Sequence, residues 1–351
     1  MNNNTGDKPA KPLKSPRFAV FGNPIEHSLS PQIHQAFAVQ CGLEIEYDKV
    51  APTMEDFENK VNEFFRNGGV GANVTLPFKE RAYRMVHQNP ANDNPYRMGT
   101  HTDHEAYNDA WTSHSANTLY LAGSPGDATN TPVLGCANTD GVGLIQDLSK
   151  NLGWELSGKN ILLVGAGGAI RGIIPALFRA VNPKNQDKAP TTNIFITNRT
   201  QERTDAIISH MQKNSLIPYN LHSIELKELG PEQEITAMDL ADKYHFDIII
   251  NGTSFNLGGG NPNGGAGGQD TAEFPLNKSL VHGGLHCYDL VYNKNGRTCF
   301  TEWARKHGAA QVSDGLGMLV EQAARSFCIW NSKDLEYLAT QQLIKDLRSA
   351  K

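Results

Sequence analysis

A short apolar run followed by a glycine-rich turn, at residues 161–171, constrains the fold more than any other stretch. Its first four residues are apolar without interruption, as in a strand buried on both faces. Gly165, Gly167 and Gly168 follow, and then residues that can begin a helix. Such a turn lets backbone N–H groups approach a diphosphate at a helix N-terminus. Because Ile170 stands at the third glycine position of the usual fingerprint, both a dinucleotide site and an ordinary tight turn fit the pattern.

Apolar runs alternate with segments of helical spacing along most of the chain. Strands are predicted at residues 17–22, 46–50, 69–74, 161–164, 194–197, 247–250 and 285–291. Helices are predicted at residues 31–42, 54–67, 79–86, 140–152, 201–212, 301–307, 315–330 and 334–347. Since parallel strands need crossover helices, this alternation predicts an α/β fold with helices on both faces of its sheets.

The length of 351 residues favours two domains separated by a cleft. We expect residues 17–141 to form a first α/β domain with a parallel-dominated sheet. Residues 142–315 should form a Rossmann-type cofactor domain, and the terminal helices within 316–351 should pack back on the first domain. Residues 1–16 are rich in Asn, Lys and Pro and lack an apolar signal-peptide core, so we expect a disordered leader.

Charge and cysteine content exclude several classes of function. The 32 Lys and Arg residues nearly balance 37 Asp and Glu residues, which argues against a nucleic-acid partner. No apolar run approaches the roughly 20 residues that cross a bilayer, so no membrane segment is expected. The five cysteines are scattered without a CxxC pair, which favours the reduced cytoplasm over a disulfide framework or a zinc site.

The regular pattern fails over residues 87–114. This segment is polar and holds four of the twelve histidines. No two of them stand at i, i+4 on an otherwise regular element, which weakens a metal site. We therefore interpret the segment as a solvated surface loop and predict no metal.

The strand at 194–197 ends in Asn198, Arg199 and Thr200, and Arg203 follows one helical turn later. In dinucleotide domains a carboxylate at this point binds the ribose 2′-OH of NAD, whereas arginine accommodates the 2′-phosphate of NADP. Two guanidinium groups four residues apart can hold a phosphate in fork geometry. This pattern favours NADP; the alternative is a solvated basic helix start.

Four polar residues in the first domain carry candidate chemistry. Ser28 and Ser30 lie just before a predicted helix with Pro31 at its first position, and two hydroxyls at a helix start suit a small carboxylate. Lys79 follows the strand predicted at 69–74, and residues 135–141 (GCANTDG) place Asp140 at another strand end; ligands of open α/β sheets collect at such ends. The alternatives are that Ser30 and Asp140 only cap helices and that Lys79 is solvated.

Nine ordered blocks connect these signals to one family. They are residues 22–31 (GNPIEHSLSP), 73–79 (NVTLPFK), 116–118 (ANT), 137–141 (ANTDG), 165–169 (GAGGA), 198–200 (NRT), 251–254 (NGTS), 288–293 (YDLVYN) and 314–322 (DGLGMLVEQ). With them the chain resembles the shikimate dehydrogenases over residues 17–330. The resemblance implies reversible NADP-linked reduction of 3-dehydroshikimate to shikimate, on the way to chorismate and the aromatic amino acids.

The resemblance also implies a role for each matching residue. Lys79 would be the acid/base and Asp140 its partner. The substrate would be held at its carboxylate by Ser28 and Ser30, at its ring hydroxyls by Thr75, Asn117 and Gln322, and along one side by Tyr292. The cofactor would lie on Gly165, Ala166, Gly167, Gly168 and Ala169 at the diphosphate, on Asn198, Arg199, Thr200 and Arg203 at the adenosine phosphate, and on Leu290 and Gly315 at the nicotinamide.

The implied chemistry suits these residue types. Hydride arriving at a ketone leaves negative charge on oxygen, which a nearby ammonium can stabilise and protonate. A carboxylate beside that ammonium orients it and favours its charged form. The resemblance implies a small-molecule substrate. We also expect some hinge closure, as in other two-domain enzymes, a cytoplasmic location in line with the scattered cysteines, and a homodimer as one candidate assembly.

Two departures and two alternatives stay open. The connection between Lys79 and Asn117 is longer than usual in the family, so a family position contributed from the helix after the lysine cannot be placed. The connection at 182–192 is longer as well, and both are interpreted as surface insertions. The nearest alternative is a quinate/shikimate dehydrogenase that uses NAD or both cofactors. A more remote alternative is a cofactor-sensing regulatory protein without catalysis, although Lys79 and Asp140 argue against it.

Overall fold

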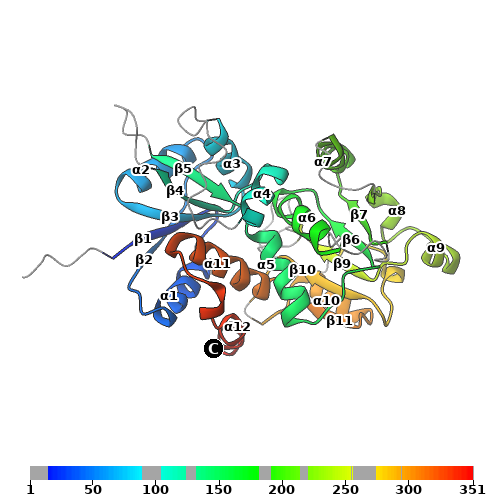
Figure 1. The fold of residues 1–351 in the computed structure, drawn as a ribbon. Helices are drawn as coiled ribbons and strands as arrows, with labels where there is room; N and C mark the ends of the chain where they lie inside the picture. Colours follow the sequence, from blue (N-terminus) through cyan, green and yellow to red (C-terminus); the bar gives the residue numbers. More distant parts are fainter. Residues whose placement is uncertain are drawn as a thin grey trace, which may run out of the picture.

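The computed structural model describes residues 15–88, 104–123, 132–181, 191–213, 220–253, 255, 274–293 and 295–350. Within these residues the strands form two sheets that lie side by side, each covered by helices (Figure 1). This arrangement confirms the predicted α/β fold. Most of the predicted leader and most of the insertion at 182–192 lie outside the described residues.

The first sheet is mixed. Its strand order is β2 (Glu46–Val50), β1 (Arg17–Phe21), β3 (Gly69–Val74), β4 (Thr118–Gly123) and β5 (Val133–Ala137). β1 pairs in parallel with β2 and β3, whereas β4 runs antiparallel to both β3 and β5. No strand was predicted at β4. Parallel pairing is thus confined to the first three strands.

Helices cover both faces of the first sheet. Its helices are α1 (Ser30–Gln40), α2 (Phe57–Arg66) and α3 (Lys79–His87). The two faces follow from the alternation of side chains along β1. Phe18 packs with the α1 residues Ile33 and Phe37, while Ala19 and Phe21 pack on the opposite side with α2 and α3.

The second sheet is parallel throughout, as expected of a Rossmann-type unit. Its strand order is β11 (Gln311–Ser313), β10 (His286–Asp289), β9 (Ile248–Asn251), β6 (Asn160–Val164), β7 (Asn193–Thr197) and β8 (Leu221–Ser223). Its helices are α6 (Gly168–Val181), α7 (Gln201–Lys213), α8 (Leu226–Leu229), α9 (Ala237–Asp242) and α10 (Cys299–Lys306). No helix in the described ranges is long and apolar enough to cross a membrane.

Three helices join the two sheets. α5 (Asp140–Gln146) continues into a π-helical turn (Asp147–Asn151), and α11 (Leu316–Asn331) packs against α5 and α1. α12 (Thr340–Ser349) follows α11 and shares its core with α1. α12 therefore lies beside α1, in the helical layer of the first sheet (Figure 1).

The interpretation of residues 87–114 as a solvated loop is wrong for its last part, which forms α4 (His104–Ser113). α4 packs against α6, and its buried Asp109 forms a bidentate ion pair with Arg179. The buried face consists of small and polar side chains, including Ala106 and Ala110, so it gives no apolar signal. Residues 89–103 lie outside the described part of the chain.

Candidate active site

Lys79 and Asp140 meet at the carboxyl edge of the first sheet. Lys79 is the first residue of α3, after β3, and Asp140 is the first residue of α5, after β5. Lys79 Nζ lies 2.6 Å from Asp140 Oδ2, and their side chains are only 12% and 5% exposed. Lys79 is therefore not a solvated lysine. Asp140 does not cap its helix either, since Thr139 is the N-cap of α5 and the described Thr139 side chain forms no capping bond with that helix.

Asn117 connects this ion pair to α11. Its side-chain Nδ2 lies 2.9 Å from Asp140 Oδ1, 2.9 Å from Gln322 Oε1 and 2.9 Å from Thr139 Oγ1. Its Oδ1 accepts hydrogen bonds from the backbone N–H of Thr139 and the hydroxyl of Thr118. All of these residues are buried. The Asn117 amide thus holds Oδ1 of Asp140, and Oδ2 of the same carboxylate accepts from Lys79.

A second layer of polar side chains lies below, around Asn73. The Asn73 Oδ1 accepts hydrogen bonds from the Tyr47 hydroxyl at 2.7 Å and from His34 Nε2 at 3.0 Å. Its Nδ2 donates to the Asn117 carbonyl and to the Ser326 hydroxyl of α11. Burial lowers the pKa of His34 to about 3, so the imidazole is neutral. The layer ties α1, β2, β3 and α11 together beneath the ion pair.

Ser28 and Ser30 form a hydroxyl pair at the start of α1. The Ser28 hydroxyl donates to Ser30 Oγ at 3.2 Å and accepts from the Ser30 backbone N–H at 3.3 Å. Leu29, not Ser30, is the N-cap, and no side-chain capping bond is present in this part of the described chain. The capping interpretation of Ser30 is therefore wrong. Burial raises the pKa of the nearby Tyr292 phenol, which accordingly keeps its proton and remains a donor.

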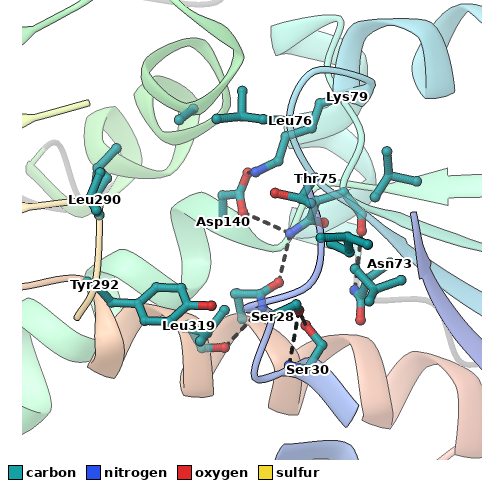
Figure 2. Close-up of a pocket in the computed structure, with 18 of the residues that line it drawn as sticks. Ser28, Ser30, Asn73, Thr75, Leu76, Lys79, Asp140, Leu290, Tyr292 and Leu319 are labelled. Carbon is teal, nitrogen blue, oxygen red and sulfur yellow. Dashed lines mark hydrogen bonds and ion pairs between the residues drawn. The ribbon is translucent and has the colours of Figure 1, made fainter. Parts of the chain in front are cut away.

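These groups surround one cavity of about 360 Å³. Figure 2 shows Leu290 and Tyr292 on one side of it, facing Thr75 and Lys79 on the other. The predicted residues that line it are Ser28, Ser30, Thr75, Lys79, Asn117, Asp140, Tyr292 and Gln322 for catalysis and substrate, and Ala169, Leu290 and Gly315 for the cofactor. Both sheets thus contribute walls to the same cavity.

The glycine turn stands next to the ion pair. Gly165 has φ +115°, a conformation that favours glycine, and its N–H donates to the Thr197 carbonyl. A Cβ built at Gly167 would meet nothing within 4 Å, so the turn faces open space there. A Cβ at Gly168 would lie 3.8 Å from Lys79 Cβ. The turn of the second sheet therefore approaches the lysine of the first.

The predicted adenosine-phosphate residues lie farther out. Arg203 lines a second cavity, which it shares with Gly167, Gly168 and Lys79. Arg199 is exposed, as is Thr200, and neither lines one of the two cavities. Three further predicted residues, Gly165, Ala166 and Asn198, are partly or fully buried and also line neither cavity. The structure thus brings together the residues predicted for the substrate and for the nicotinamide, and leaves part of those predicted for the adenosine phosphate at the surface.

Sequence reasoning missed several residues of the site. Asn73 begins the block at residues 73–79 but was assigned no role. Its hydrogen-bond partner His34 lies one helical turn after Ser30 and was not named either. Met318 and Leu319 line the cavity beside Gln322. Their spacing on one helix gives an available signal, because residues three and four apart share a face.

The fold and the site define a class of protein. A parallel α/β unit with a glycine turn faces a second α/β unit that carries a buried lysine–carboxylate pair beside a polar cavity. These are the features of a two-domain, dinucleotide-dependent oxidoreductase.

Comparison with known proteins narrows this class. Residues 20–93 match the family model described as the shikimate dehydrogenase substrate binding domain. The chain is 38% identical to a shikimate dehydrogenase (NADP(+)) of Alkalilimnicola ehrlichii, over 90% of this chain and 93% of the relative. It resembles the crystal structures of an Ael1 enzyme from Pseudomonas putida (TM-score 0.67, 30% identity, 95% and 98% of the two chains covered) and of a shikimate dehydrogenase in complex with NADP+ (TM-score 0.67, 25% identity, 96% and 97% covered). The chain belongs to the shikimate dehydrogenase family.

Proposed function

We propose that this chain catalyses the reversible NADP-linked reduction of 3-dehydroshikimate to shikimate, a step toward chorismate and the aromatic amino acids. The observation that carries the proposal is the 2.6 Å contact between Lys79 and Asp140, in a cavity that the second sheet closes from the other side. The name of the relative from A. ehrlichii supports the same reaction and the same cofactor.

The second unit suits the cofactor. Gly167 faces open space where a side chain would obstruct a diphosphate, and α6 begins directly behind it. Arg199 and Arg203 are exposed and have no ion-pair partner among the described residues, so both guanidiniums are available to a phosphate. Bound NADPH would supply hydride to the substrate's carbonyl carbon from the cavity wall near Leu290 and Gly315.

The first unit suits a hydroxylated carboxylic acid. We assign the substrate carboxylate to the hydroxyls of Ser28 and Ser30, together with the phenol of Tyr292. The ring hydroxyls fall to Thr75, Asn117 and Gln322, in the family's pattern. All six side chains line one cavity, and amides and hydroxyls can each both donate and accept.

Lys79 is the acid/base in this proposal. When hydride adds to the carbonyl carbon, the C=O π electrons move to oxygen, and the Lys79 ammonium donates a proton there. In the reverse direction the neutral amine accepts the proton of the substrate hydroxyl. Asp140 holds the lysine at the cavity, and Asn117 holds Asp140. Arginine at position 79 could stabilise the charge but is a poor proton donor near neutral pH.

We also propose that the two units divide the work along the predicted boundaries. Residues 17–141 bind the substrate, with helices from 316–351 supplying Gln322, and residues 142–315 bind NADP. A cytoplasmic location, a homodimer and hinge closure on binding stay predictions. Sedimentation of the purified chain tests the dimer, and scattering with and without ligands tests the closure.

A steady-state assay with two acids and two cofactors tests the function. Shikimate or quinate is offered with NADP+ or NAD+, and reduced nicotinamide is followed by absorbance. We expect the highest kcat/KM for shikimate with NADP+. A preference for quinate or for NAD+ would instead indicate the quinate/shikimate alternative. Cofactor binding without turnover of either acid would indicate the regulatory alternative.

A further inference from the structure

The second cavity adjoins the substrate cavity and runs along α3. It measures about 800 Å³, and Leu76 and Lys79 line both it and the substrate cavity. Gly167, Gly168 and Arg203 form its wall on the second unit. Since these three positions are the expected diphosphate and adenosine-phosphate contacts, the cavity continues the cofactor's path away from the nicotinamide end.

The opposite wall of this cavity belongs to the first unit and is rich in charge. Glu80, Arg84 and Gln88 line it from α3 and the residue after it, at i, i+4 spacing on one face. All the cofactor contacts assigned from the family motifs lie on the second unit, so no residue of this wall has an assigned role.

Arg84 is the available cation on that wall. Arg81, which also lines the cavity, is engaged by Glu58, with Nε 2.8 Å and Nη2 2.6 Å from its carboxylate oxygens. The ammonium of Lys79 is engaged by Asp140. Arg84 is exposed and has no ion-pair or side-chain hydrogen-bond partner among the described residues. Arg203, on the wall of the second unit, is likewise exposed and has no ion-pair partner among the described residues.

The charges leave room for an anion between the two walls. The Glu58–Arg81 pair contributes no net charge, and Glu80 offsets one of the two unpaired guanidiniums. The side chains around the cavity therefore keep a net charge of about one positive unit, and Gly167 and Gly168 of the glycine turn line the same cavity. Two guanidiniums facing each other repel as a cleft narrows unless an anion lies between them. A phosphate satisfies both, because each guanidinium can bind it in fork geometry.

We propose that Arg84, on the substrate unit, binds a phosphate of the dinucleotide across the cleft from Arg203. The cofactor is then held by both units, and its phosphates draw α3 toward the glycine turn. Arg84 is a cofactor-binding residue in this scheme, not an acid or base. The inference rests on the proposed function for the identity of the dinucleotide.

Direct binding tests the inference without turnover. Calorimetry with NADP+, NAD+, 2′,5′-ADP and ADP is compared between the wild type, Arg84→Gln and Arg66→Gln. Arg66 is an exposed arginine of α2 that lines neither cavity, so its substitution removes the same charge elsewhere. We expect Arg84→Gln to raise the Kd for NADP+ by about tenfold, as for loss of one charge-assisted contact. The Arg66→Gln Kd should stay within twofold of the wild type, and so should the KM for the acid in both variants.

The four ligands show which phosphate Arg84 contacts. Weakening of NADP+ and 2′,5′-ADP alone assigns it to the 2′-phosphate. Equal weakening of all four assigns it to the adenosine 5′-phosphate, which all four carry, and weakening of all but 2′,5′-ADP assigns it to the second phosphate of the diphosphate. Unchanged affinity for all four in Arg84→Gln overturns the inference, as does a rise only in the KM for the acid. A wild type that binds NADP+ tightly but does not oxidise shikimate refutes the proposed function and leaves this inference standing. A wild type that binds none of the four ligands refutes both.

Discussion

The two walls of the cleft are built in opposite ways. On the first unit, Asn117, Asp140 and Gln322 are buried and bonded to one another. On the second unit, Gly167 faces open space and Arg203 is exposed without an ion-pair partner in the described chain. The wall that we assign to the substrate, the substrate wall, therefore has its polar groups bonded within the protein, whereas the wall that we assign to the cofactor, the cofactor wall, leaves its guanidinium in water until a ligand binds.

This difference predicts different costs for substitutions on the two walls. A buried polar group that loses its partner pays the full desolvation cost of the orphaned atoms. An exposed cation has its charge screened by water, so removing it changes stability little. Substitutions in the substrate wall should alter stability and activity together, and those in the cofactor wall should alter cofactor affinity alone.

The largest effect is expected at Lys79. Lys79→Ala should lower kcat by about a hundredfold to ten-thousandfold, the usual contribution of general acid–base catalysis. Calorimetry should still detect shikimate binding, because the groups assigned to its carboxylate and ring hydroxyls remain. Lys79→Arg should lower kcat to a similar extent, because arginine is a poor proton donor near neutral pH. Lys60→Ala, an exposed site on α2, is the matched control. Turnover of Lys79→Ala within a few fold of the wild type would remove the residue from the mechanism.

Asn117 tests the buried network itself. Asn117→Ala leaves Asp140 Oδ1 and Gln322 Oε1 without their shared donor, so the free energy of unfolding should fall by about 2–3 kcal/mol. The kcat should fall as well, since Asp140 is less well held. Urea denaturation measures the first effect, and Asn62→Ala on α2 is the control. A variant as stable as the wild type would show that the wall is not preorganised by this amide.

His34 makes the free energy of unfolding depend on pH. Its pKa is about 3 in the folded protein and about 6.5 when unfolded. Below pH 6.5 the unfolded chain gains a proton that the folded chain does not, so stability falls as the pH drops toward 3. At pH 5 the loss is about 2 kcal/mol. His34→Gln should lack this part of the decline between pH 7 and pH 5, and an unchanged slope would contradict the burial argument.

The smallest effect is expected on the cofactor wall. Arg203→Gln should raise the Kd for NADP+ by about tenfold and leave that for NAD+ unchanged, because only NADP carries the 2′-phosphate. The free energy of unfolding should stay within about 0.5 kcal/mol of the wild type. Loss of stability comparable to Asn117→Ala would abolish the distinction between the walls.

The sequence predicted best what regular patterns encode. The apolar run before Gly165 is β6, and the polar residues that follow separate strands converge because the strand ends of each sheet meet at one edge. The residues assigned to the substrate line one cavity for this reason. The capping alternatives for Ser30 and Asp140 fail because each is the first helical residue, one position past the cap.

The sequence was least informative where packing uses polar or small residues. α4 escaped prediction because its inner face pairs Asp109 with a distant Arg179, and no local pattern contains that pair. The layer around Asn73 depends on His34 of α1 and Tyr47 of β2, which come from different elements and both donate to the Asn73 side-chain oxygen. The availability of Arg84 depends on which neighbouring arginine Glu58 binds, which only the structure gives.

The central claim is that Lys79, held by Asp140, faces the reacting oxygen of the substrate beside the glycine turn. A crystal structure of the complex with shikimate and NADP+ measures this contact directly. We expect Lys79 Nζ at hydrogen-bond distance, about 3 Å, from the hydroxyl that is oxidised, with the Asp140 contact kept. Shikimate bound in this cavity with its reacting hydroxyl out of reach of Lys79, or bound elsewhere, would contradict the claim.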